Sequence, residues 1–377
     1  MVQGELGQYP KSSQFRAWRL FRRQANSEQV IFLALTIALI AALILTPLAK
    51  LIATKLNILD KPGFRKIHHK PIPLTGGMAV FSAFALALLT VGGLSRETVG
   101  LTVIGLLFVL FGTLDDAGIK VRARSKIIAH LVLAAGLVYL AGVHFTFFST
   151  PWLNWLLTIG FIAFMTNSMN MLDGMDGLVS GVCFIAAAIF LALGLNSSQP
   201  EILLAAAAVM GATLGFLRYN FNPASIFLGE AGSTFLGFIM AYLAIRLNLF
   251  SLWNVAISLG IERLQIVSFV VPLIILGIPI FDTYFVFTNR FLHKVKFSQP
   301  GKDHSHHRIN LMGFSQRATV LTLYAVQVVL GAIAVSMLRA DLQQFISLLL
   351  IVAVFFVGFT VFLLRVDVYP VHGDKGV

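Results

Sequence analysis

Eleven long apolar runs constrain the fold of this chain more than any other feature. Of its 377 residues, 58% are hydrophobic and only 12% are charged. About 20 consecutive apolar residues suffice to cross a bilayer as a helix, so we expect an all-α, polytopic membrane helix bundle of about eleven transmembrane helices. The runs cover residues 30–52, 75–94, 99–114, 127–148, 153–169, 178–195, 201–220, 231–250, 264–289, 319–338 and 343–364.

The same runs set the expected domain organisation. Run 30–52 is too long for a signal-peptide core, so we expect it to be retained as a span. We therefore divide the chain into a basic N-terminal tail (1–29), one transmembrane domain (30–365) and a C-terminal tail (366–377). The single cysteine, Cys183, excludes a disulfide framework and a thiolate metal site.

Basic residues orient the predicted bundle. The net charge of +12 could suggest a nucleic-acid partner. However, Lys and Arg lie in short loops between apolar runs, as residues that set membrane orientation do, so we expect no nucleic-acid binding. The most basic loops, 53–74, 115–126 and 290–318, alternate onto one side, which we predict to be cytoplasmic. An odd number of spans then places the N-terminus outside, which conflicts with the basic tail unless that tail lies along a membrane surface or the count is wrong by one.

Acidic residues gather on the same predicted side. Ionisable groups at membrane depth are costly and usually functional, so this clustering indicates one polar site built from several helix ends. The acidic residues concerned are Asp60, Asp115, Asp116, Asp173, Asp176, Glu230 and Asp303, with Asp282 inside a nearby apolar run.

Segment 167–178 carries a polar residue at every third position. On a helix, Asn167, Asn170, Asp173 and Asp176 would share one face. Such a stripe could bind a hard cation or hydrogen-bond sugar and base groups. The alternative is a capping loop of Asn, Asp and Gly at the end of a span.

Two further acidic motifs stand at predicted helix ends. The adjacent side chains of Asp115 and Asp116 would diverge by about 100° on a helix, so we expect them to do different work. Glu230 lies among small residues just before an apolar run, where backbone amides suit a phosphate and a carboxylate suits Mg²⁺. The alternative for Asp115 and Asp116 is an ordinary solvated helix end, and for Glu230 it is an N-cap whose carboxylate complements the helix dipole.

Histidines and a basic loop complete the polar side. His304, His306 and His307, beside Arg308, could bind zinc or hydrogen-bond a pyrophosphate. Their spacing on a helix disfavours zinc, and a solvated basic loop is the remaining alternative. The first basic loop, which contains Lys70, could meet anionic headgroups or merely reflect the orientation bias.

Taken in chain order, these segments resemble the polyprenyl-phosphate N-acetylhexosamine-1-phosphate transferase family, and most of all its branch that starts surface polysaccharides. The matching segments are 65–77, 115–116, 167–178, 221–233, 279–282 and 304–308. The resemblance implies a bundle of ten or eleven transmembrane helices, often dimeric, in a bacterial inner membrane with a cytoplasmic active site. It also implies that UDP-GlcNAc and undecaprenyl phosphate give undecaprenyl-diphospho-GlcNAc and UMP, with Mg²⁺ or, as the alternative ion, Mn²⁺.

The resemblance further implies roles for individual residues. The implied catalytic residues are Asp115, Asp116, Asp173 and Asp176. The implied metal ligands are Asp116, Asn170 and Glu230. The implied substrate contacts are Lys70, Asn170, Asn220, Phe227, His304, His306, His307 and Arg308. Phe227 is expected to stack on uracil. The chain departs from the family at Glu230, where Asp is usual, and the extra methylene would shift the metal geometry or the preferred ion.

Two alternatives remain at this point. The first is the peptidoglycan branch of the same family, which transfers phospho-MurNAc-pentapeptide, although the histidine segment looks more like the GlcNAc branch. The second is a secondary transporter. Transporters usually bind their substrates near the midplane between repeats, whereas here the acidic residues gather at one face and no repeat is visible.

Overall fold

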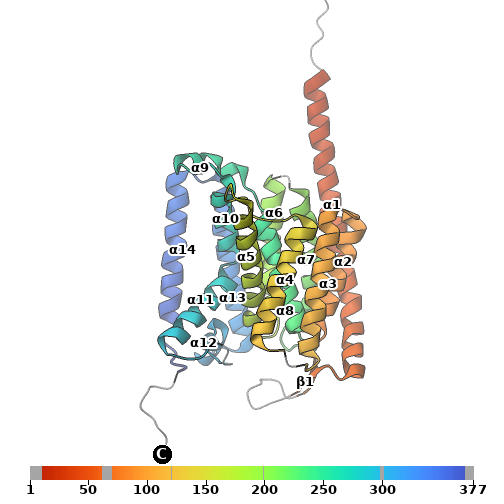
Figure 1. Cartoon of the computed structure of the whole chain (residues 1–377), viewed down its shortest axis with the longest axis vertical. Coiled ribbons are helices and arrows are strands. Elements are labelled where there is room, and N and C mark those ends of the chain that lie inside the picture. Colours follow the sequence, from red (N-terminus) through yellow and green to blue (C-terminus); the bar gives the residue numbers. More distant parts are fainter. Residues whose placement is uncertain (1–10, 62–69, 120, 198, 298–300, 370–377) are drawn as a thin grey trace, which may run out of the picture.

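The computed structural model describes residues 11–61, 70–119, 121–197, 199–297 and 301–369, with side chains from residue 28 onward. Within these ranges the chain is a helix bundle with one two-stranded hairpin (Figure 1). The elements are α1 (Lys11–Leu56), β1 (Leu59–Asp60), β2 (Ile72–Pro73), α2 (Gly76–Gly92), α3 (Arg96–Asp116), α4 (Ala123–Ala141), α5 (Pro151–Leu172), α6 (Leu178–Ser197), α7 (Pro200–Asn220), α8 (Gly229–Arg246), η1 (Phe250–Leu252), α9 (Trp253–Ser258), α10 (Leu264–Ile275), α11 (Gly277–Leu292), α12 (Ser305–Leu311), α13 (Gln316–Ser336), η2 (Met337–Arg339) and α14 (Leu342–Leu363).

The helices match the predicted membrane spans. Among the described residues, eight helices are long and apolar enough to cross a membrane, and two bent pairs would add two crossings. The shorter apolar helix α2 supplies one more candidate. The all-α, polytopic prediction is thus confirmed, and the chain is a multi-pass membrane protein. Helix α1 already begins within the predicted N-terminal tail.

Two predicted spans differ from the structure. Run 127–148 ends as a helix at Ala141, because Gly142 adopts a left-handed conformation with φ of 70°. Run 264–289 is bent by 78° where α10 meets α11. Pro279 lies in the first turn of α11 and lacks an amide donor. A Cβ atom on Gly277 would lie only 3.0 Å from Leu330 and from Phe356, so the start of α11 packs closely against both side chains. The pattern of apolar residues in the sequence predicts which segments are buried in the membrane, but it does not predict where their helices end or bend.

Small residues let α1 and α7 approach closely. Gly211 and Gly215 lie one turn apart on α7, and a Cβ atom on Gly215 would come within 2.7 Å of Ala42 on α1. Lipid gives helices no hydrophobic reason to associate, so close backbone packing of this kind stabilises membrane bundles. This contact holds the first span against the centre of the bundle.

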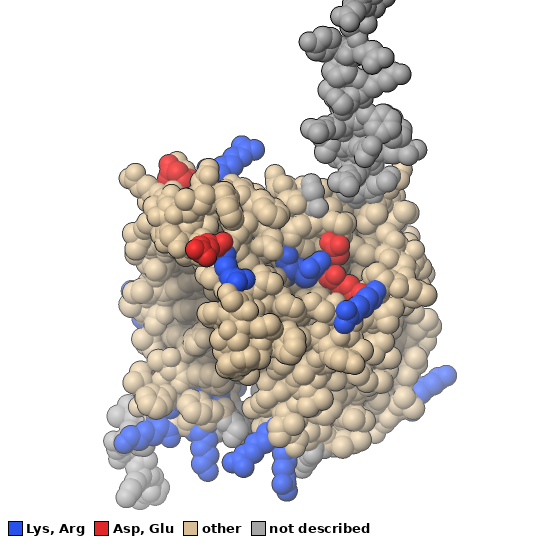
Figure 2. Space-filling model, turned by 45° about the horizontal axis from the view of Figure 1, so that its top comes forward, with Lys and Arg blue, Asp and Glu red and all other residues tan. Residues whose placement is uncertain are grey.

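Loops that carry polar motifs meet at one end of the bundle, the lower end in Figure 1. The β1–β2 hairpin and α12 lie there, and α1 projects from the opposite end (Figure 1). Basic side chains line the lower edge of the molecule in Figure 2. The fold therefore brings helix ends that are far apart in the sequence to the same end of the bundle.

Candidate active site

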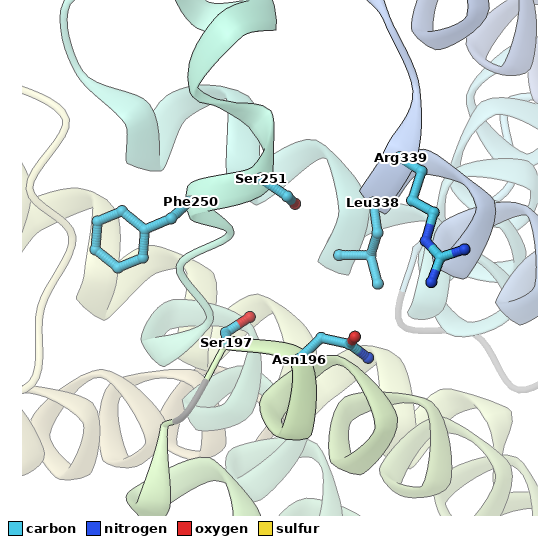
Figure 3. Close-up of a pocket in the computed structure, with 6 residues that line it drawn as sticks. All are labelled: Asn196, Ser197, Phe250, Ser251, Leu338 and Arg339. Atoms are coloured by element: carbon cyan, nitrogen blue, oxygen red, sulfur yellow. The ribbon is translucent and has the colours of Figure 1, made fainter. Parts of the chain in front are cut away.

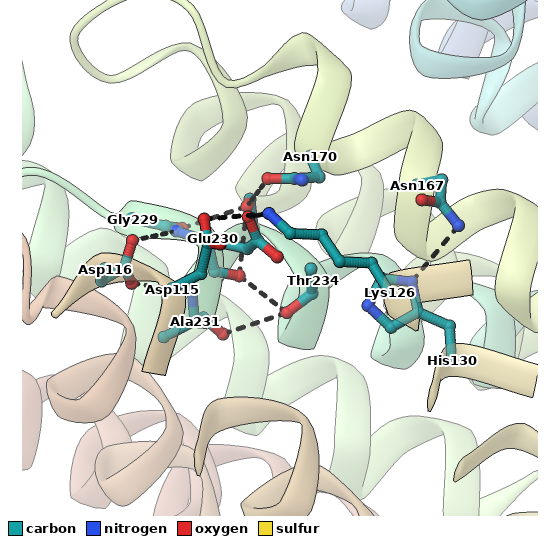
Figure 4. A network of polar contacts seen from close by, with 11 residues as sticks. Asp115, Asp116, Lys126, His130, Asn167, Asn170, Gly229, Glu230, Ala231 and Thr234 are labelled. Carbon is teal, nitrogen blue, oxygen red and sulfur yellow. Dashed lines mark hydrogen bonds and ion pairs between the residues drawn. The ribbon is translucent and has the colours of Figure 1, made fainter. Parts of the chain in front are cut away.

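A lysine joins two carboxylates where α3, α4 and α8 meet (Figure 4). Nζ of Lys126 lies 2.9 Å from Oδ2 of Asp115 and 2.5 Å from Oε2 of Glu230. All three side chains are at least partly buried, so water screens these charges less than it would at a free surface. The ammonium holds two negative groups together that would otherwise repel each other.

Asp116 has a different task from its neighbour, as the helical geometry predicted. Its Oδ1 and Oδ2 atoms accept hydrogen bonds from the backbone amides of Glu230 and Ala231, at 2.9 and 3.1 Å. Its carboxylate therefore caps the N-terminus of α8, where negative charge is favoured. These two amides, which the sequence suggested for a phosphate, are occupied by Asp116.

One carboxylate oxygen of the cluster is left without a hydrogen-bond partner in the part of the chain that the structure describes. It is Oε1 of Glu230, which is buried, whereas Oε2 pairs with Lys126. Close by on α5, Oδ1 of Asn170 accepts from the hydroxyl of Ser233 at 2.9 Å. A free buried carboxylate oxygen beside an amide oxygen fits Mg²⁺, which takes oxygen ligands and usually completes its shell with water and substrate phosphates.

The end of α5 carries only part of the predicted polar stripe. Asn167 and Asn170 share the helix face, but α5 ends at Leu172, so Asp173 is its C-cap and Asp176 lies in the following turn. The carboxylate of Asp176 accepts from Asn222 Nδ2 and from the amide of Ala224, both at 2.9 Å. Burial, with the negative charges of Asp116 and Asp176 nearby, raises the pKa of Asp173 to about 8.

Three predicted substrate contacts lie in or beside loop 221–228. Asn220 is buried, and its amide bonds Gly177, Ser180 and Ile226, so its polar atoms hold the loop together. The backbone of Phe227 pairs with Pro73 and Gly76 and leaves its ring partly exposed. Lys70 is exposed and lines a cavity of about 540 Å³ with Lys50 and Ser225. The preceding part of the predicted basic segment, 65–69, lies outside the described residues.

Helix α12 carries the histidines and brings them against the turn that contains Asp173. Nδ1 of His304 lies 2.7 Å from Oδ2 of Asp282 on α11, and the hydroxyl of Ser305 donates to Oδ1 of the same carboxylate. The ring of His306 lies directly against Gly174, where a Cβ atom would clash with it. The contact brings α12 onto the turn that holds Asp173.

The three histidines differ in charge. Burial lowers the pKa of His304, but the neighbouring Asp282 carboxylate outweighs it and raises the pKa above its usual value. Burial lowers the pKa of His307 to about 4 and lowers that of His306 well below its usual range. Both are therefore neutral near pH 7. Among the described residues no group of three His, Cys, Asp or Glu side chains is arranged to hold a metal ion, and the zinc alternative gains no support.

Arg308 turns away from the histidine face of α12. Its guanidinium is buried and donates to the carbonyls of Asp303, Leu363 and Val366, at 3.2, 3.3 and 2.5 Å. It also lies over the ring of Phe285, 5.1 Å from its centroid. These contacts anchor α12 to the end of α14, in place of the pyrophosphate contact expected for this residue.

Sequence reasoning missed several members of the site. Lys126 was counted only as an orienting charge of loop 115–126, but the structure places it in the first turn of α4, directly before apolar run 127–148. His130 follows one turn later, and its Nδ1 lies 3.2 Å from Asn167 Nδ2 (Figure 4). Asn222 donates a hydrogen bond to Asp176, but nothing in the sequence distinguishes it from any other asparagine in a loop.

A second described cavity, of about 320 Å³, lies away from these groups (Figure 3). Asn196, Ser197, Phe250, Ser251, Leu338 and Arg339 line it. These residues come from the end of α6 and from η1 and η2, which join the ends of spans opposite to those that carry the carboxylates. None of the predicted site residues lies in this cavity.

A known protein family matches the part of the chain that carries this site. Residues 98–248, which include Asp115, Lys126, Asn170 and Glu230, match the profile of the glycosyl transferase family 4. The chain belongs to this family. The match covers α3 to α8, which supply the carboxylate cluster.

Individual relatives extend the similarity over most of the chain. A probable undecaprenyl-phosphate N-acetylglucosaminyl 1-phosphate transferase of Bacillus subtilis (strain 168) is 34% identical, over 86% of this chain and 90% of the relative. The undecaprenyl-phosphate alpha-N-acetylglucosaminyl 1-phosphate transferase of Escherichia coli (strain K12) is 26% identical, over 82% and 84%. The phospho-N-acetylmuramoyl-pentapeptide-transferase of Bacillus subtilis (strain 168) is 26% identical, over 82% and 98%.

Proposed function

We propose that this protein transfers GlcNAc-1-phosphate from UDP-GlcNAc to undecaprenyl phosphate and releases UMP. The observation that carries the proposal is the Asp115–Lys126–Glu230 cluster, which lies beside the Asp116 cap at one end of a membrane bundle. Because the cluster lies at one end of the bundle, we propose that a membrane lipid and a charged nucleotide meet there. The names of the relative from Bacillus subtilis that is 34% identical and of the relative from Escherichia coli that is 26% identical support the same reaction.

Mg²⁺ is the cofactor that we propose. Glu230 and Asn170 would hold it, with the carboxylate of Asp116 nearby, and phosphates of the substrates and water would complete its shell. When bound, the ion would neutralise charge that develops on the phosphate oxygens. Mn²⁺ prefers the same oxygen donors and remains the alternative ion.

The residues of the chain would align the two phosphorylated substrates. An oxygen of the lipid phosphate attacks the β-phosphorus of UDP-GlcNAc, the bond from that phosphorus to the bridging oxygen breaks, and UMP leaves. Lys126 contributes positive charge next to the reacting phosphates, and protonated His304 contributes positive charge from α12. Asp173, with its raised pKa, can hold or release a proton near neutral pH.

The basic loops support a cytoplasmic site in a bacterial cell membrane. Arg122 and Arg124 flank the start of α4, and Lys294 and Lys296 follow α11, all near the end that holds the carboxylates. The positive-inside rule assigns such loops to the cytoplasm. UDP-sugars and the site would then share one compartment.

A transfer assay with the purified protein tests the proposal. Radiolabelled UDP-GlcNAc, undecaprenyl phosphate and Mg²⁺ should give a labelled lipid, and UDP-MurNAc-pentapeptide should give none. Asp116→Asn should abolish the product, and Glu230→Gln should lower it strongly at a Mg²⁺ concentration that just saturates the wild type. Glu262→Gln, which changes an exposed carboxylate between α9 and α10, should preserve the product. A lipid product from UDP-MurNAc-pentapeptide alone would instead assign the chain to the peptidoglycan branch. Full activity in both site variants would refute the proposed roles.

A further inference from the structure

Residues 364–369, which follow α14, fold back onto the base of α12; we call them the strap. The hydroxyl of Tyr369 donates to Oδ2 of Asp303 at 2.7 Å. The ring of Tyr369 stacks on His293, with 4.4 Å between the ring centroids. A single residue of the strap thus contacts the end of α11 and the residue two positions before α12.

Asp303 is the centre of a buried ion pair. Arg290 donates to both of its carboxylate oxygens, at 2.7 and 2.8 Å, and only 5% and 3% of the two side chains are exposed. Burial raises the pKa of Asp303, but hydrogen bonds from Arg290 and Tyr369 outweigh it and bring the pKa down to about 2. The carboxylate is therefore ionised at physiological pH and can receive the Tyr369 hydroxyl as a charge-assisted donor.

A second set of contacts joins the strap to α12 itself. Arg308 donates to the carbonyl of Val366 in the strap and lies over the ring of Tyr369, 5.9 Å from its centroid. Arg308 directly follows His307 in the sequence. Asp303 lies just before α12 and Arg308 is its fourth residue, so anchoring these two positions also fixes the histidines between them.

The far side of α12 meets the acidic turn. His306 lies against Gly174, one residue beyond Asp173, and none of its ring nitrogens has a hydrogen-bond partner among the described residues. Its position is therefore set by packing and by the anchoring of α12. The contacts run without a gap from Tyr369 to Asp303, through α12 to His306, and on to Gly174.

We propose that the strap is a positioning device that holds the α12 histidines over the Asp173 turn, with Tyr369 as its principal positioning residue. This inference rests on the proposed function in assigning α12 to the nucleotide sugar. Tyr369 touches no reacting atom. It acts through Asp303 and Arg308, so its loss should weaken binding of the nucleotide sugar and leave the lipid substrate unaffected.

Kinetics of a conservative variant test the proposal. Tyr369→Phe keeps the ring and removes only the hydroxyl, and we expect the KM for UDP-GlcNAc to rise about fivefold while the KM for undecaprenyl phosphate stays unchanged. Tyr369→Ala should have a larger effect of the same kind. Tyr139→Phe, whose side chain is 80% exposed at the end of α4, is the matched control and should change neither value.

A spectroscopic measurement reports on α12 directly. The only native cysteine, Cys183, is buried, so a nitroxide on Lys302→Cys would be the only accessible label. We expect Tyr369→Phe to increase the mobility of this label, and Tyr139→Phe to leave it unchanged. Asp303→Asn should act on the same contact, so adding it to Tyr369→Phe should raise the nucleotide-sugar KM by less than the product of the two single effects.

The outcomes separate this inference from the proposed function. Wild-type label mobility in both Tyr369 variants would overturn the strap, and so would raised mobility with an unchanged KM for the nucleotide sugar. An equal rise in the KM of both substrates would also overturn it, because it would indicate general loosening of the site. If the wild-type protein transfers no GlcNAc-1-phosphate, the proposed function fails, and label mobility still decides whether Tyr369 anchors α12.

Discussion

The ammonium group of Lys126 lies 2.5 Å from Oε2 of Glu230, and this ion pair joins the first turns of α4 and α8. The two residues are more than 100 positions apart in the sequence. Only 9% of the Glu230 side chain and 20% of the Lys126 side chain are exposed. Removing Lys126 would leave Glu230 as an unpaired charge in a poorly screened environment.

Replacing Lys126 by Met should therefore lower turnover sharply. Asp115 and Glu230 would repel each other without the ammonium, and positive charge next to the phosphates would be lost. We expect kcat to fall by about 10²-fold or more, as for the loss of one electrostatic group in a preorganised site. Lys126→Arg should be less affected, and Lys55→Met, an exposed lysine at the end of α1, should be normal in the lipid-transfer assay. Equal turnover in Lys126→Met and Lys55→Met would rule out this role.

Changes at Glu230 should alter the response to metal ions. Glu230→Gln replaces one carboxylate oxygen by an amide nitrogen, so we expect the Mg²⁺ concentration for half-maximal activity to rise at least about tenfold. Glu230→Asp keeps the charge and shortens the side chain, so it should stay active with a changed ratio of Mg²⁺ to Mn²⁺ activity. Metal titrations of the transfer reaction measure both effects. Identical titration curves for all three proteins would show that Glu230 holds no metal.

Asp173 should make stability depend on pH. Its folded pKa is about 8, whereas an aspartate in an unfolded chain titrates near 3.9, about the value of a model peptide. Between these values the folded state holds a proton that the unfolded state has lost. The free energy of unfolding should therefore fall as the pH rises from about 4 to about 8, and this contribution should level off above.

Thermal unfolding in detergent without divalent ions measures this dependence. The variant Asp173→Asn cannot titrate, so the difference between its thermal midpoint and that of the wild type isolates the contribution of this one group. We expect the wild type to lose stability relative to Asp173→Asn as the pH rises toward 8. A constant difference over the whole range would contradict the raised pKa.

A methyl group on Gly174 should displace α12. The Cβ atom of Gly174→Ala would clash with the ring of His306, and a shift of a reacting group by about 1 Å can cost 10²-fold in rate. We expect kcat/KM for UDP-GlcNAc to fall at least about tenfold. Gly160→Ala on the preceding helix α5 is the matched control, because nothing lies within 4 Å of the added atom there. Wild-type kinetics in Gly174→Ala would place His306 away from the turn.

Much of the fold could be predicted from the sequence because a bilayer leaves few options. Apolar runs must become helices when no water can satisfy the backbone, so run 99–114, although short, became the full helix α3. The bend before Gly277 could not be predicted from hydropathy, because apolar residues continue across it without a polar interruption. The end of α4 at Gly142 depends on one left-handed residue within a continuous apolar run.

The members of the site were easier to predict than their partners. Asp115, Asp116, Asp173 and Glu230 stood out because acidic residues are rare in this chain, and the structure brings them to one end of the bundle. Lys126 was missed as their partner, because a lysine near a basic loop looks like an orienting charge. Asn220 and Arg308 were assigned to substrate, but their polar atoms are used inside the protein. Such pairings depend on long-range contacts that no local pattern encodes.

The Asp116 cap also has a consequence for biosynthesis. Its carboxylate seals the beginning of α8, and α8 is translated after four intervening spans have left the ribosome. Until α8 has been made, Asp115 and Lys126 lack Glu230, and Asp116 has no helix end to cap. Helix α12 is made later still. A chain that is incomplete at this stage would therefore lie in the membrane without the chemistry of the finished one, and any fragment that retains this chemistry must include everything from α3 to α12.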